Sequence, residues 1–66
     1  METELVATKV RISNGMQRTE QVIAHRWGDR HFVKQFTDGR QTSFWRAEDL
    51  NVLRQRLQSN GFVVAG

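Results

Sequence analysis

The chain has 66 residues, no cysteine and no proline, and its ten Lys/Arg against seven Asp/Glu give a formal net charge of +3. This length predicts one small domain, residues 1–66, burying about 60% of the surface that its unfolded chain exposes. The missing cysteines exclude a disulfide scaffold and a thiolate zinc site. No apolar run approaches the roughly 18 residues of a membrane span, and the beginning METELVATKV lacks a signal-peptide pattern. We therefore expect a soluble, cytoplasmic protein with no membrane partner.

Three two-residue turn signals divide the first two thirds of the chain. They are Asn14-Gly15, Gly28-Asp29 and Asp38-Gly39, each flanked by β-branched or aromatic residues. Such pairs supply the positive φ angles of tight β-hairpins, so they predict a four-stranded antiparallel meander. The expected strands cover residues 5–13, 17–27, 30–37 and 40–45.

The hydrophobic period changes after Arg46 from that of a strand to that of a helix. Leu50, Leu53 and Leu57 recur at the spacing of one helix face, and Asn60-Gly61 supplies a C-terminal stop. No Ser, Thr, Asp or Asn directly precedes Ala47, so we expect a frayed or unusual helix start. Residues 62–64 indicate a short strand or an apolar tail. The predicted fold class is α+β, a meander with one C-terminal helix packed on one face.

The strand register sorts the side chains onto two faces. If each turn contains only its two central residues, paired residue numbers sum to 29, 57 and 77 in the three hairpins. One face is then apolar, and we expect the helix leucines to pack on it, with Gln21, His25 and Lys34 at its rim. Its apolar members are Val6, Val10, Ile12, Ile23, Trp27, Phe32, Phe36 and Trp45. A one-residue bulge would invert every assignment that follows it.

The opposite face is mostly basic. Its members are Ala7, Lys9, Arg11, Arg18, Glu20, Val22, Ala24, Arg26, His31, Val33, Gln35, Arg40, Thr42 and Phe44. Arginine exceeds lysine by eight to two in the chain, and guanidinium groups suit phosphates and base edges. We therefore predict a nucleic-acid-binding module, with DNA or RNA as partner. Phosphate contacts are assigned to Lys9, Arg11, Arg18, Arg26 and Arg40, and an apolar or stacking contact to Phe44. The plainer interpretation is a solvated sheet surface.

We expect no catalytic activity, no metal site and no cofactor. Glu48 and Asp49 point in different directions at a helix start, where both suit the helix dipole. His25 and His31 fall on opposite faces of the sheet, which disfavours a shared metal site. The sequence contains no GxSxG, no glycine-rich phosphate loop and no HExxH.

The segment GDRHFVKQFTDGRQTSFWRAEDLNVLRQRL, about half of the chain, resembles two known layouts. It is similar to the three-stranded arm-binding domains of phage integrases, which implies a sheet that enters the DNA major groove and an origin in a phage or other mobile element. It also resembles the last strands of Tudor and SH3-like barrels, which implies a protein-interaction module. The N-terminal hairpin is extra to the first layout, and the helix is too long for the second. The alternative function is therefore protein interaction or assembly, including a homodimer formed through an edge strand or through residues 62–64.

Overall fold

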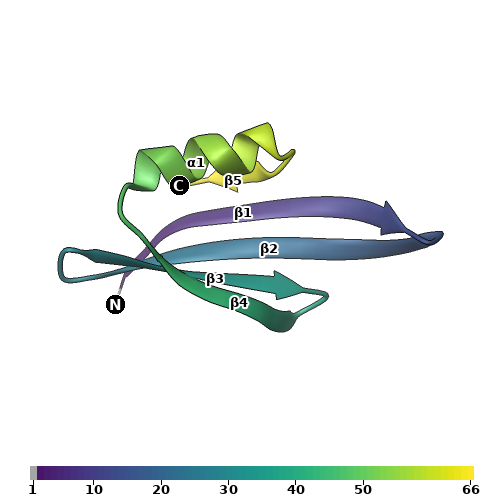
Figure 1. Ribbon diagram of the computed structural model, residues 1–66, viewed down its shortest axis with the longest axis horizontal. Helices are drawn as coiled ribbons and strands as arrows, with labels where there is room; N and C mark the ends of the chain where they lie inside the picture. Colours follow the sequence, from purple (N-terminus) through teal and green to yellow (C-terminus); the bar gives the residue numbers. More distant parts are fainter. Residues whose placement is uncertain (1) are drawn as a thin grey trace.

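The computed structural model describes residues 2–66, which form a five-stranded antiparallel sheet with one helix (Figure 1). The elements are β1 Glu2–Ser13, β2 Met16–Trp27, β3 Arg30–Thr37, β4 Arg40–Ala47, α1 Leu50–Ser59 and β5 Val63–Ala65. The sheet order is β4-β3-β2-β1-β5, so the first four strands form the predicted meander and the C-terminal strand pairs with β1. The predicted α+β fold class is confirmed. Within residues 2–66, no helix is long and apolar enough to cross a membrane.

The hairpin turns have the backbone geometry that their residues predict. Asn14 and Gly15 both have positive φ, 52° and 75°, as a tight turn between two twisted strands requires. The register of the first hairpin is as predicted from Leu5 onward, and Lys9, for example, lies opposite Glu20. The register of the second hairpin is also as predicted. The first two hairpins therefore follow from turn chemistry alone.

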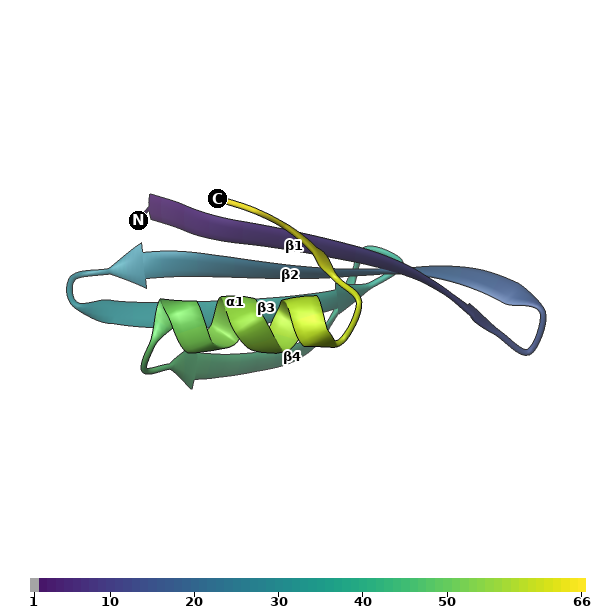
Figure 2. The same ribbon diagram turned by 90° about the horizontal axis from the view of Figure 1, so that it is seen from above.

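β1 and β2 continue past the other strands as a two-stranded ribbon, residues 9–19, which gives the molecule its 41 Å long axis (Figure 2). Asp38, in the turn between β3 and β4, anchors the base of this ribbon. Its backbone N–H donates to the carbonyl of Thr19 at 2.8 Å, and its carboxylate accepts from the Thr19 N–H at 2.9 Å and from Arg18 Nη1 at 3.1 Å. The ribbon is thus held at its base and free along most of its length.

The helix begins later than expected and has a well-formed cap. β4 continues to Ala47, and Asp49 is the N-cap of α1, with its carboxylate accepting from the backbone N–H groups of Asn51 and Val52 at 2.8 and 3.2 Å. The expectation of a frayed start was wrong because the cap, Asp49, lies three residues after Arg46, the position at which a capping residue was expected. Asp49 thereby satisfies two of the helix's free N–H donors.

Asp49→Ala should lower the free energy of unfolding by about 0.5–2 kcal/mol, because it leaves those two N–H groups without their side-chain acceptor. Urea denaturation followed by circular dichroism measures this change. Glu48→Ala is the matched control, because it removes a neighbouring exposed carboxylate that caps nothing within residues 2–66. If the free energy of unfolding fell by the same amount in both variants, Asp49 would not act as the cap.

α1 lies on the face of the sheet that was predicted to be open and basic, so that assignment was wrong (Figures 1 and 2). The buried core consists of Leu5, Ala7, Val22, Ala24, Val33, Leu53 and Leu57. Ala7 and Ala24 are fully buried, and their small side chains let a helix approach the sheet closely. A ten-residue helix is only about 15 Å long, so it covers the middle of a longer sheet and leaves charged residues on the same side exposed around it.

A bulge in β4 exchanges the positions of two aromatic side chains. Phe36 lies opposite Gln41 as predicted, but Gln35 lies opposite Ser43, so the register shifts by one residue. Trp45 consequently lies on the helix side, where it packs against the core, and Phe44 lies on the opposite side. Relative to the helix this agrees with the sequence, which had predicted Trp45 beneath the helix and Phe44 in the open. Relative to the neighbouring strand it does not, because Trp45 was expected opposite Phe32 and lies opposite Val33. The two-residue Asp38-Gly39 turn gives no sign of a bulge further along the strand.

Candidate nucleic-acid interface

The five cations predicted to bind phosphate lie on the helix side of the sheet, whereas Phe44 lies on the other side. These cations are Lys9, Arg11, Arg18, Arg26 and Arg40. Arg26 is near one end of the sheet, at the turn before β3, and Arg40 is at the turn after β3, with α1 between the two regions. The structure therefore does not gather the six predicted contact residues into one surface.

Three of these cations are engaged within the chain. Lys9 Nζ donates to the backbone carbonyl of Asn60 at 2.6 Å, and Arg11 Nε lies 3.6 Å from Glu20 Oε2. Arg18 donates to the turn carboxylate that anchors the ribbon. A phosphate at these positions would have to compete with existing partners. That these residues contact nucleic acid stays a prediction.

The sheet face opposite α1, which we call the uncovered face, is rich in apolar side chains. By register they are Val6, Val10, Ile12, Ile23, Trp27, Phe32, Phe36 and Phe44. Trp27 is 65% exposed and Phe44 is 56% exposed, so two large aromatic side chains meet solvent on one face. Contiguous apolar surface of this kind marks interaction sites in folded proteins.

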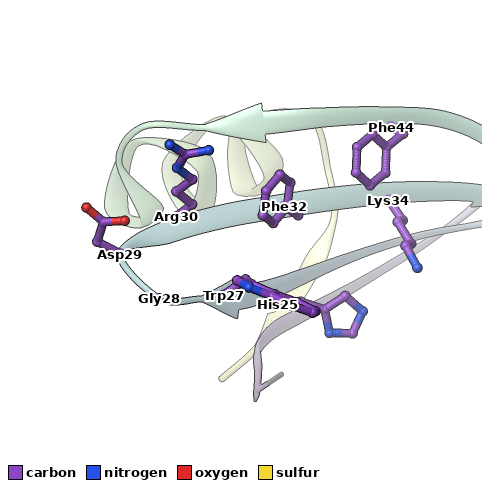
Figure 3. A pocket seen from close by; sticks show the side chains of 8 residues that line it. All are labelled: His25, Trp27, Gly28, Asp29, Arg30, Phe32, Lys34 and Phe44. Atoms are coloured by element: carbon purple, nitrogen blue, oxygen red, sulfur yellow. The ribbon is translucent and has the colours of Figure 1, made fainter.

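Three aromatic rings follow one another along the uncovered face in Figure 3, Trp27 beside the turn between β2 and β3 and Phe32 and Phe44 further from it. Phe32 on β3 and Phe44 on β4 stack with ring centroids 5.9 Å apart and planes at 17°, an arrangement made possible by the β4 bulge. Trp27 lies on β2, the next strand across. Together these rings border a hollow of about 590 Å³, which we call the aromatic hollow. Its lining residues are His25, Trp27, Gly28, Asp29, Arg30, Phe32, Lys34 and Phe44.

The charge around the aromatic hollow is positive. Arg30 and Lys34 line it, and Arg46, paired with Phe32, lies on the same face by register. Within residues 2–66, neither Arg30 nor Lys34 forms a salt bridge, and no strand residue of the uncovered face is acidic. The carboxylate of Asp29, in the turn, points away from the rings in Figure 3. The hollow therefore combines aromatic surface with a net positive charge, since two cations line it against the one carboxylate of Asp29.

The two histidines lie apart, on opposite faces as the register predicted. His25 lies on the uncovered face and hydrogen-bonds with Thr3 Oγ1 at 3.2 Å. His31 lies on the helix side, 2.9 Å from Glu4 Oε2, and the other oxygen of that carboxylate is buried without a hydrogen-bond partner in the described part of the chain. Within the same residues, no group of three or more His, Cys, Asp or Glu side chains is placed to hold a metal ion.

No protein-family model, no curated protein and no solved structure matches this chain. Its function must therefore be argued from the site itself. The sequence reasoning missed the aromatic hollow because it assigned Trp27 and Phe32 to the buried core. Two signals could have shown otherwise: Lys34 and His25 fall on the same face as these rings, and alanines on the opposite face leave room for a helix.

Proposed function

We propose that this protein is a non-catalytic module that binds single-stranded DNA or RNA in the aromatic hollow. One observation carries the proposal: exposed aromatic rings and unpaired cations share a sheet face whose strands carry no carboxylate. A cytoplasmic location and an origin in a mobile element fit this role, and both stay predictions.

The chemistry of a single strand matches both parts of the hollow. Every base has a flat π surface that stacks on aromatic side chains, and Trp27, 65% exposed, offers more ring surface to solvent than Phe44, 56% exposed. The phosphates between bases need cations, which Arg30 and Lys34 supply at the rim. In a closed duplex the base faces are stacked on each other, so the rings would have no partner. Single strands should therefore bind more tightly than duplexes.

A second copy of the chain fits the aromatic hollow poorly. Face-to-face packing there would bring the Arg30 and Lys34 cations of both copies into one interface that has no strand carboxylate to pair with them. An anionic partner is favoured over self-association at these positions.

Titration with labelled single strands of about ten nucleotides, in the size range of single-strand sites, tests the proposal, with a duplex of the same sequence for comparison. Arg30→Gln should weaken single-strand binding several-fold and reduce the slope of log K against log[salt] by about 0.7, the value for one phosphate contact on a single strand. Folding should be unchanged because Arg30 is exposed and unpaired in the described structure.

Arg40→Gln is the matched control, because Arg40 is also an exposed arginine beside a hairpin turn but lies on the helix side. We expect its binding and salt slope to stay close to those of the unchanged protein. If Arg40→Gln weakens binding and Arg30→Gln does not, the basic face predicted from the sequence is the interface, and the hollow is not. Absence of binding at low salt to every DNA and RNA strand tested would overturn the nucleic-acid proposal.

A further inference from the structure

A second region of the uncovered face carries no charge at all. It follows β5, β1 and the adjoining part of β2, and we call it the aliphatic strip. Its members on β5 and β1 are Val63, Ala65, Val6, Thr8, Val10 and Ile12. On β2 it continues with Gln17, Thr19, Gln21 and Ile23. Three of its side chains are strongly exposed, Val10 at 56%, Ile12 at 78% and Val63 at 77%.

The proposed nucleic-acid function does not account for this strip. The cations of the uncovered face lie on β3 and β4, on the other side of β2 from β1 and β5. Aliphatic side chains offer neither a stacking surface nor a charge for phosphate. The strip also runs out along the ribbon, where β1 and β2 have no third strand beside them (Figure 2). A two-stranded ribbon is marginally stable in water by itself, so apolar cover would stabilise it.

We propose that the aliphatic strip is a dimer interface, occupied by the same strip of a second copy of this chain. The absence of charged residues from the strip favours this occupant. The chain has a net charge of +3, yet every residue of the strip is uncharged, so a twofold pairing of strips buries no charge on either side. A partner with a charged contact surface would leave its charges without counter-ions there.

The placement of the cations fixes the arrangement of the two copies. With the twofold axis parallel to the strands and passing over the strip, the two sheets stack through β5, β1 and β2 while each β3–β4 half extends outward on its own side. The like charges of Arg30 and Lys34 are then kept apart. Both aromatic hollows remain open, so dimerisation and strand binding are compatible.

The size of the strip predicts a weak dimer. The strip spans seven residues of each long strand, 6–12 of β1 and 17–23 of β2, and the three residues of β5. At about 3.3 Å per residue and about 4.8 Å between strands, it covers roughly 270 Å² per copy. The total of roughly 540 Å² is well below that of permanent dimers and belongs with weak, transient contacts. We expect the monomer and dimer to exchange at concentrations of about 10 µM to 1 mM.

Sedimentation equilibrium of the full chain without nucleic acid tests this inference over that concentration range. The average mass should rise with concentration from that of one chain toward that of two and level off there. Ile12→Lys and Val63→Lys should each raise the dissociation constant at least about tenfold, because each would bury an unpaired charge in the interface. Both side chains are more than three quarters exposed, so both variants should fold, which circular dichroism checks.

Met16→Lys is the matched control, since Met16 is 58% exposed at the tip of the same ribbon but pairs with Ser13 on the helix side. It adds the same charge and should leave the dissociation constant unchanged. The strip dimer would be overturned by a wild-type chain that stays monomeric to 1 mM or by an average mass that rises beyond two chains. It would also be overturned if Met16→Lys raised the dissociation constant as much as the other two variants. None of these results depends on nucleic-acid binding, so the two proposals can fail separately.

Discussion

Leu53→Ala should lower the free energy of unfolding by about 2–5 kcal/mol, the largest change in stability that we expect from a single truncation in this chain. Leu53 is 7% exposed and lies in the core cluster between α1 and the sheet, with Val22 and Val33 beneath the helix. Truncation removes three carbon atoms from this contact and leaves a cavity. A domain of 66 residues has a total stability of only about 3–10 kcal/mol, so much of the variant should be unfolded at 37 °C.

Val52→Ala is the matched control for this prediction. Val52 is the preceding residue of α1 and is 45% exposed, so its truncation removes little buried contact. Alanine also has the higher helix propensity, and the stability should stay constant or rise slightly. Thermal unfolding by circular dichroism compares the two variants directly. If they unfold at the same temperature, Leu53 does not anchor the helix to the sheet.

The strand order and the first two registers could be read from the sequence because they depend on short-range chemistry. Asn14-Gly15 fixes one turn and thereby the pairing of β1 with β2 from Leu5 to Ala24. The stop at residues 60–61 and the apolar segment that follows were also informative: β5 pairs with β1, and Phe62 packs against the core. Local backbone preferences decide such features before any tertiary contact forms.

The choice of face could not be read in the same way, because both faces carry enough apolar residues to form a core. Counting them favours the face of Trp27 and Phe32, which has the larger rings. The helix lies instead on the face of Ala7 and Ala24, where close packing is possible. Packing density depends on the shape of the contact, and a count of apolar residues does not contain that shape.

The candidate site was only partly predictable for the same reason. Phe44 was singled out as an exposed aromatic residue, and it is exposed, but on the face opposite to the predicted cations. The one-residue shift of register in β4 separates Phe44 from Arg40 and brings it onto Phe32. A bulge changes which side chains share a face without changing the fold, so an error at one residue separated Phe44 from the predicted cations.

Trp27→Ala should weaken binding of a single strand by about 1–3 kcal/mol, the contribution of one base stacked on an aromatic ring, which corresponds to about a 5- to 150-fold rise in the dissociation constant. The indole is 65% exposed, so little packing is lost and the fold should remain. Because the side chain is neutral, the slope of log K against log[salt] should not change. Fluorescence anisotropy of a labelled strand measures both quantities.

Trp27→Phe and Met16→Ala separate stacking from general loss of apolar surface. Trp27→Phe keeps an aromatic ring and should retain most of the affinity, whereas Met16→Ala removes an equally accessible apolar side chain on the helix side and should have no effect. A base that stacks on Trp27 also quenches its fluorescence, while the half-buried Trp45 on the opposite face gives a constant background. If the affinity of Trp27→Ala equals that of the unchanged protein, the bases do not enter the aromatic hollow, and the cations at its rim bind the phosphates alone.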